Sequence, residues 1–137
     1  MRHRLYVHVT WTTRDRAPLI TAKVAMFLAR FLPAIAAQER AGVLAVGVVS
    51  NHVHLLLRLD PATVIARLMQ RLKGGSAALA QRERHSPDGE PLRWAKGYNL
   101  ESVSPGSVPT VVHHLLRQPQ RDPHEAIAGW PPPGSAS

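Results

Sequence analysis

Hydrophobic and polar residues alternate along two stretches of this chain, residues 5–13 and residues 52–59. Such alternation is typical of strands that bury one face. Between them, residues 43–49 form an almost continuous valine-rich run, which predicts a more deeply buried strand. Only Ser50 and Asn51 separate this run from the second alternating stretch, so the chain is predicted to form an antiparallel hairpin here.

Two long segments carry apolar residues at helical spacing. Thr21 is placed to cap a helix that ends at Gly42. Pro33 lies inside that pattern and should kink the helix or shift one of its ends. Residues 61–82 predict a second helix, which the Lys-Gly-Gly-Ser step at residues 73–76 should weaken.

The C-terminal part of the sequence is more irregular. Residues 84–91 predict a polar loop, and residues 93–104 predict a further strand. A last helix is expected from near Ser107, and Pro119 should stop it. The remaining residues, 120–137, are rich in proline, glycine, serine and alanine, so they predict a loosely held or disordered tail.

The predicted order of elements is strand, helix, strand, strand, helix, strand, helix. This order indicates an α+β domain with a mainly antiparallel sheet and helices packed on one face. The domain is expected to span residues 1–119, followed by the tail. No segment has the roughly 18 apolar residues that would cross a membrane, and the N-terminus does not read as a signal peptide. We therefore expect a soluble, cytoplasmic protein.

Composition narrows the chemistry. The chain has no cysteine, which excludes disulfides, thiolate zinc sites and a cysteine nucleophile. Its 17 basic residues against 9 acidic ones give a formal net charge of +8, and most of the basic residues are arginine. Arginine suits phosphate, so the charge favours a nucleic-acid partner. A basic composition inherited from a GC-rich genome would explain the same charge, so charge alone names no function.

His52 and His54 are the sharpest chemical signal. Because side chains of a strand repeat every two residues, both imidazoles should project from one face, close enough to bind one metal ion together. Two solvent-facing histidines on a sheet are the alternative. His8 points to the polar face of the first strand, where it could orient a ligand, contact DNA or be an ordinary surface histidine.

Several segments together resemble one known family. Their order along the chain is the one found in the single-tyrosine HUH transposases. The segments are the first strand at residues 8–11, the histidine-hydrophobic-histidine hairpin at residues 45–56, the helix at residues 68–74, and Gly97-Tyr98 with residues 102–105. The resemblance is strongest to the group associated with repetitive extragenic palindromes. It covers most of positions 3 to 118.

This resemblance implies a ferredoxin-like or RRM-like homodimer that processes single-stranded DNA folded into hairpins. Mg²⁺ or Mn²⁺ would be held by His52, His54 and Gln118, and a tyrosine on the last helix would attack the scissile phosphate. The nucleophile's position falls on His114, four residues before Gln118. That departure leaves two interpretations open: His114 acts as the nucleophile, or it is a third imidazole on the metal and no strand is cut.

The remaining expectations concern DNA contacts and rival functions. Trp11 and Trp94 could stack bases, although a core role fits Trp11 better. A catalytically inactive, domesticated DNA-binding module is the alternative function, acting as a repressor or maintaining repeats. A third hypothesis is an RRM-type RNA-binding domain. It is weaker because such domains stack bases on aromatic side chains of a central strand, and no such aromatic pair is found here. The basic residues expected to contact DNA phosphates are Arg14, Arg16, Arg67, Arg71, Lys73, Arg93 and Lys96.

Overall fold

The computed structural model describes residues 5–82, 91–121 and 123–131. Its centre is a four-stranded antiparallel sheet with strand order β2-β3-β1-β4. The strands are β1 (Leu5–Thr12), β2 (Ala41–Val49), β3 (His52–Leu59) and β4 (Asn99–Val103). The α+β, ferredoxin-like fold predicted from the sequence is therefore confirmed.

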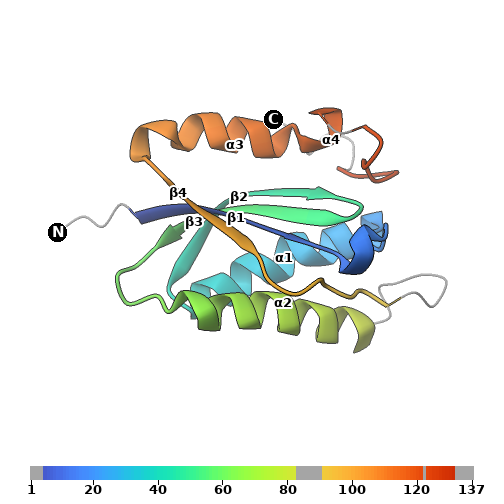
Figure 1. The fold of residues 1–137 in the computed structure, drawn as a ribbon, viewed down its shortest axis with the longest axis horizontal. Helices are drawn as coiled ribbons and strands as arrows, with labels where there is room; N and C mark the ends of the chain where they lie inside the picture. Colours follow the sequence, from blue (N-terminus) through green and yellow to red (C-terminus); the bar gives the residue numbers. More distant parts are fainter. Residues whose placement is uncertain (1–4, 83–90, 122, 132–137) are drawn as a thin grey trace.

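Two long helices, α1 (Ala22–Gln38) and α2 (Ile65–Arg82), pack side by side on one face of the sheet (Figure 1). They close the main core, to which the strands contribute their buried positions, among them Val9, Leu55 and Leu57. The short helices α3 (Val108–Leu116) and α4 (Gln118–Arg121) lie over the opposite face (Figure 1). There, Leu56 and Leu115 form a second, smaller apolar cluster with Ala45.

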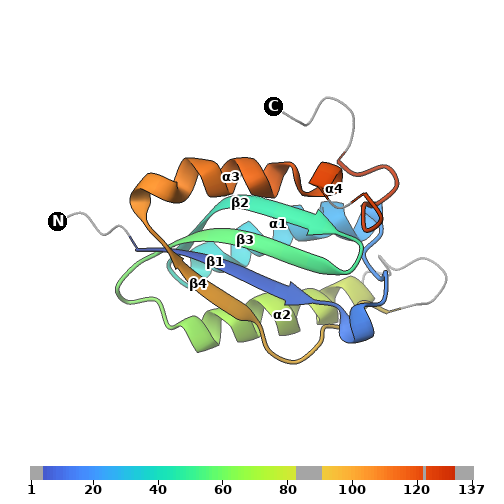
Figure 2. The same cartoon turned by 45° about the horizontal axis from the view of Figure 1, so that its top comes forward.

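The helix α3 covers only part of that second face. It packs mainly against β2 and β3, while β1 and most of β4 lie farther from it, as the turned view of Figure 2 shows. The uncovered half carries polar side chains because the alternation of β1 sends Val7, Val9 and Trp11 into the main core. A polar, partly open surface therefore adjoins the covered half, and the candidate site lies where the two halves meet.

The predicted helix boundaries are partly right. Thr21 does cap α1, since its hydroxyl accepts from the Val24 amide at 3.3 Å. The helix continues through Pro33 and ends at Gln38, before Gly42, because Arg40 adopts a left-handed conformation with φ 62° and β2 begins at once. Helix α2 runs unbroken through Gly74 and Gly75, and a Cβ on Gly75 would come 3.1 Å from Phe31 Cζ of α1.

The fourth strand is shorter than the predicted span of residues 93–104. Trp94 forms only an isolated bridge with Thr13, and β4 starts at Asn99. Gly97 has φ 83°, a conformation that interrupts an extended strand. In addition, the Lys73 ammonium donates to the carbonyls of Ala95 and Gly97 at 2.8 and 2.6 Å, so these groups bond outside the sheet ladder.

The C-terminal segment is better packed than its composition predicted. Ile127 is buried in the main core, and Trp130 packs against the same core. The main chain at Glu125 accepts a hydrogen bond from the Ser50 amide at 2.7 Å. The prediction of a loose tail is therefore wrong for residues 123–131, because a few apolar side chains suffice to anchor it. Residues 132–137 of the predicted tail and most of the predicted loop at 84–91 lie outside the described residues.

None of the helices in the described part of the chain combines the length and the apolar character needed to span a membrane.

Candidate functional site

His52 and His54 lie on the face of β3 that α3 and α4 partly cover. The pairing register places Thr12 opposite His52 and Thr10 opposite His54, and Gly47 of β2 lies on the other side of His54. The two imidazole rings are 4.8 Å apart between centroids. The strand period that predicted a shared face is thus realised, and the pair is close enough for both rings to approach one ion.

The ring of His52 is held from two sides. Its Nδ1 lies 2.7 Å from Asn51 Oδ1, and its Nε2 lies 3.3 Å from Nε2 of Gln118. Both His52 and Gln118 are buried, with 7% and 6% of their surfaces exposed. The structure therefore brings Gln118 beside His52, although the two residues are separated by 66 positions in the sequence.

The ring of His54 meets polar groups from β1. Its Nδ1 lies 3.0 Å from His8 Nε2 and 3.1 Å from Thr10 Oγ1, and the rings of His8 and His54 stack at 5.1 Å. His54 Nε2 is buried and has no hydrogen-bond partner among the described residues. A buried nitrogen without a partner is costly unless an ion or water satisfies it.

The electrostatic surroundings keep His54 neutral. Burial, followed by the nearby His52, His8 and Arg121, lowers the pKa of His54 to about 3, against an opposing effect of Glu125. Burial also lowers the pKa of His8, although Glu101 opposes that shift. Neutral imidazole is the form that binds a metal ion, so His54 is ready to bind across the physiological pH range.

Gln118 reaches the site because α3 docks tightly on β2. A Cβ on Gly47 would lie 2.8 Å from the Leu115 carbonyl oxygen, so only glycine permits this approach. Helix α3 ends at Leu116, and α4 begins at Gln118 with Pro119 in its first turn. The predicted last helix therefore ends before Pro119, at Leu116. Pro119 does not stop it but lies in the first turn of α4, where proline is tolerated.

His114 is exposed on α3, next to the buried Leu115 and one turn before Gln118. A helical break at Arg117 separates His114 from Gln118, so one continuous helix face does not carry both. The structure thus brings His54 and Gln118 next to His52, while His114 lies on the exposed side of α3. The chain's two tyrosines are elsewhere, Tyr6 on β1 and the exposed Tyr98 just before β4.

Sequence reasoning missed Asn51, Thr10 and Glu125. The sequence places Asn51 in the turn of the hairpin, yet its side chain bonds to His52 and, through Nδ2, to Glu125 Oε2 at 2.7 Å. Thr10 is one of the polar positions in the alternating pattern of β1. The alternation of β1 could have pointed to Thr10, but no local pattern links Glu125 to a histidine 73 positions earlier in the sequence.

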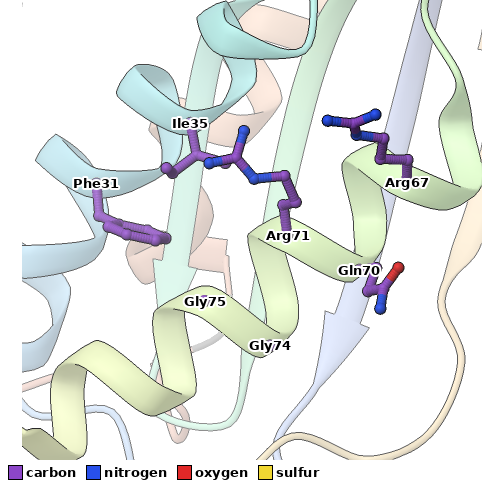
Figure 3. Close-up of a pocket in the computed structure, with 7 residues that line it drawn as sticks. All are labelled: Phe31, Ile35, Arg67, Gln70, Arg71, Gly74 and Gly75. Atoms are coloured by element: carbon purple, nitrogen blue, oxygen red, sulfur yellow. The ribbon is translucent and has the colours of Figure 1, made fainter.

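The three predicted DNA contacts on α2 form ion pairs or hydrogen bonds within the protein. Arg67 and Arg71 form ion pairs with Glu39 at 3.0 and 2.7 Å. Both line a cavity of about 520 Å³ between α1 and α2, in which Phe31 faces Gly75 (Figure 3). This cavity lies among the helices on the sheet face opposite to His52, and Lys73 binds main-chain carbonyls as described above.

The other basic candidates gather where β1 ends. Arg14 and Arg93 line an open cavity of about 350 Å³ with Asp15, and their main chains are joined by a 2.9 Å hydrogen bond. Arg16 lies in the same turn and pairs with Glu125 at 3.4 Å. Lys96 is exposed in the following loop. This group lies at the end of β1 that pairs with His52, since the Thr13 amide donates to the Asn51 carbonyl at 2.8 Å.

The tryptophans serve the core. Trp11 is 2% exposed and meets Trp94 edge to face at 5.7 Å between ring centroids. Trp94 donates from Nε1 to the Ser76 hydroxyl at 2.9 Å. Neither ring is placed on the open sheet face with His8 and Thr10, so the core role expected for Trp11 extends to Trp94.

Comparison with known families gives a match over most of the chain. Residues 1–118 match the family described as Transposase IS200 like. A curated relative, the ISDra2 transposase TnpA of Deinococcus radiodurans, is 36% identical over 75 residues. That match covers 55% of this chain and 54% of the relative, so the chain matches about half of the relative's length.

Two solved structures share the fold. A candidate transposase from Deinococcus radiodurans R1 superposes with a TM-score of 0.66 and 26% identity, covering 93% of this chain and 95% of that one. A REP-associated tyrosine transposase bound to a REP hairpin superposes with a TM-score of 0.67. It is 12% identical, covering 96% of this chain and 76% of that one, and so supports the fold alone.

Proposed function

Because this chain belongs to the IS200-like transposase family, we propose that it binds single-stranded or hairpin DNA and holds a divalent metal ion between His52, His54 and Gln118. The observation that carries the proposal is the meeting of these three side chains on one sheet face, beside an open polar surface. DNA strand cleavage and transfer are the activities that such a site serves in a transposase.

The donor set fits a divalent ion. The buried, unpartnered Nε2 of His54 and the Nε2 of His52 are imidazole nitrogens, and the Gln118 amide can offer its oxygen. The described residues contain no cluster of three His, Cys, Asp or Glu side chains able to hold a metal, so the third protein ligand would be this amide. Two imidazoles favour a transition ion such as Mn²⁺ over Mg²⁺. When bound, the ion would polarise a phosphate oxygen.

Each neighbouring residue has a part in this arrangement. Asn51 fixes the ring of His52, while Thr10 and His8 hold Nδ1 of His54 so that its Nε2 points away from β1. Leu115 and Gly47 keep α3 close to the sheet and thereby hold Gln118 in place. Because the pKa of His54 is low, His52 and His54 are not both positively charged near neutral pH. Two charged imidazoles would repel a cation.

The nucleophile decides whether the site cuts DNA. His114 occupies the position where the resemblance expects a tyrosine, and its exposed ring could meet DNA approaching over α3. Imidazole is shorter than phenol, and an attack by its nitrogen on phosphorus would give an acid-labile phosphoramidate. We therefore propose that the natural protein binds hairpin DNA without forming a lasting covalent link.

An inactive DNA-binding module is the second candidate. The absence of tyrosine from the whole C-terminal part of the sequence after Tyr98 favours it, because an intact metal site without a nucleophile can still hold a phosphate. Such a protein would repress transcription or maintain palindromic repeats. A homodimer remains part of the proposal for both functions, and light scattering of the purified protein would give its mass directly.

We propose that phosphates approach the site past the exposed cations at the end of β1, Arg14, Arg16, Arg93 and Lys96. Arg67, Arg71 and Lys73 lie on α2, on the sheet face opposite to His52, and belong to a second, weaker set. Phosphate neutralisation makes DNA affinity fall steeply with salt.

The test is titration of fluorescent hairpin and duplex oligonucleotides at two salt concentrations. Hairpin binding should be tighter and strongly salt-dependent, and replacing Arg14 and Arg93 by alanine should weaken it by about tenfold or more. Arg67→Ala is the matched control and should change affinity much less. Equal and salt-insensitive binding to hairpin and duplex would refute the DNA-binding proposal.

A further inference from the structure

Glu125 is joined to His52 through a single side chain. The carboxylate oxygen Oε2 accepts from Asn51 Nδ2 at 2.7 Å, and Asn51 Oδ1 lies 2.7 Å from His52 Nδ1. Glu125 follows residues 1–118, the part of the chain that matches the transposase family. The contact therefore adds to the candidate site a residue from outside the matched segment.

The chemistry of these three groups leaves one arrangement of protons. An ionised carboxylate only accepts hydrogen bonds, so Asn51 must turn its NH₂ group toward Glu125. The amide oxygen of Asn51 then faces His52, and because a carbonyl oxygen also only accepts, Nδ1 of His52 must carry the hydrogen. The lone pair of a neutral His52 is left on Nε2, the atom that faces Gln118.

We propose that Glu125 is a positioning residue, which acts through Asn51 to fix His52 in the tautomer protonated on Nδ1 and with its Nε2 lone pair directed into the site. The tautomer follows from these contacts and does not require a bound metal ion. Its use, to offer Nε2 to a metal ion, rests on the function proposed above. Ligating histidines are commonly oriented in this way by a bond to their other nitrogen.

Glu125 is well held for this role. Its main-chain carbonyl accepts from the Ser50 amide at 2.7 Å, which ties the segment to the hairpin that carries His52. Ile127, two residues later, is buried in the core. The hydrogen bond from Asn51 is the main cause that lowers the pKa of Glu125, so the carboxylate is ionised at neutral pH. Arg16, 3.4 Å away, adds a weaker, exposed contact.

His54 provides the contrast. Its Nδ1 meets the Thr10 hydroxyl and Nε2 of His8, and each of these groups can either donate or accept a hydrogen bond. These contacts therefore do not dictate the tautomer of His54. His52 differs because its chain of hydrogen bonds ends at the Glu125 carboxylate, which can only accept. Glu125 therefore determines which nitrogen of His52 carries the hydrogen.

The test measures the imidazole nitrogens directly. Two-bond ¹H–¹⁵N correlation spectra of the uniformly labelled protein, kept metal-free with EDTA at pH 7.5, distinguish a protonated from a bare ring nitrogen. In the natural protein, His52 should show a protonated Nδ1 and a bare Nε2. A His52 protonated on Nε2 would overturn the proposal before any variant is made.

Three variants then assign the cause. In Glu125→Ala, Asn51 is free to turn, so the Nδ1–H signature of His52 should be lost or become a mixture. Glu125→Gln can still accept from Asn51 through its amide oxygen and should restore it. Arg16→Ala removes only the exposed ion pair and should leave the tautomer unchanged. A folded Glu125→Ala protein that keeps the natural tautomer would contradict the proposal.

A second measurement separates this inference from the metal site. Mn²⁺ affinity, followed by the loss of the free-ion electron paramagnetic resonance signal, should fall by about tenfold or more in Glu125→Ala and much less in Glu125→Gln. If the tautomer changes but no protein binds Mn²⁺, the proposed metal function fails and the role of Glu125 stands. If natural protein and Glu125→Ala bind Mn²⁺ equally, Glu125 does not position a ligand.

Discussion

Gly47 of β2 lies directly under Leu115 of α3, so closely that a Cβ would come 2.8 Å from the Leu115 carbonyl oxygen. Since this atom belongs to the backbone, a larger residue cannot be accommodated by a side-chain movement. Leu115 is buried three positions before Gln118, so the distance between α3 and the sheet also sets how near Gln118 comes to His52.

Gly47→Ala should therefore lift α3 and damage the site. We expect the free energy of unfolding to fall by about 1–3 kcal/mol, as in other overpacked contacts, and Mn²⁺ affinity to fall with it. Chemical denaturation and Mn²⁺ titration measure the two effects. Gly74→Ala is the matched control, because nothing lies within 4 Å of its Cβ, and it should stabilise helix α2 by about 0.5–1 kcal/mol. Equal effects of the two substitutions would contradict the packing argument.

The stability of the metal-free protein should fall as the pH falls below about 6.5. The pKa of His54 is lowered from 6.5 to about 3 in the folded protein, so between these values the unfolded chain binds a proton that the folded chain does not. Protonation therefore favours unfolding, with a limiting slope for one group of about 1.4 kcal/mol per pH unit. Above pH 6.5, the free energy of unfolding is no longer reduced by protonation of His54.

Urea denaturation in EDTA at pH 7.5, 6 and 5 tests the sign and the slope. His54→Gln removes the titrating ring and should make the pH dependence shallower, while His8, whose pKa is also lowered, continues to contribute. A natural protein that gains stability as the pH falls over this range would show that His54 is not held neutral.

Lys73 is expected to matter more for stability than for DNA binding. Its ammonium donates to the carbonyls of Ala95 and Gly97, and partial burial lowers its pKa. Lys73→Ala should lower the free energy of unfolding by about 1.5–3 kcal/mol, the usual loss for a charged hydrogen bond. The exposed Lys96, when replaced by alanine, should change stability by less than about 0.5 kcal/mol. The opposite order of the two variants would show that the Lys73 bonds do not hold this loop.

The exposed His114 gives a gain-of-function test. The natural protein should form no durable covalent DNA adduct, whereas His114→Tyr should gain partial nicking activity, because tyrosine supplies an oxygen nucleophile beside the site. Labelled hairpin DNA is incubated with Mn²⁺ and each protein, and adducts are tested for stability to acid and to alkali. His113→Tyr, one residue earlier on the exposed side of α3, is the control. An acid-labile adduct of the natural protein that is lost in His114→Ala would establish histidine as the nucleophile.

Much of this arrangement could be predicted from the sequence because it follows from periodicity. Alternation along residues 52–59 put His52 and His54 on one face, and the hairpin at Ser50–Asn51 followed from a two-residue break. The order of elements gave the α+β class. Helix ends were less certain, since Arg40 stops α1 through a left-handed conformation that no local residue pattern required.

The rest of the site depends on tertiary contacts that periodicity does not encode. Glu125 reaches Asn51 across 74 positions of sequence, and the proline-rich composition around it gave no sign of packing. Likewise, the charge of Lys73 predicts a phosphate contact, whereas the sequence does not reveal the two carbonyls that its ammonium binds in the structure. The family resemblance supplied Gln118, which no spacing rule would have joined to His52.

The most direct test of the account is Mn²⁺ binding by the natural protein and by variants of the three proposed ligands. Electron paramagnetic resonance titration should show a single Mn²⁺ bound per chain, with affinity reduced by about tenfold or more in His52→Ala, His54→Ala and Gln118→Ala. His113→Ala, an exposed imidazole on α3, should bind like the natural protein. If the natural protein binds no Mn²⁺, or if all four variants bind it as the natural protein does, His52, His54 and Gln118 are not a metal site.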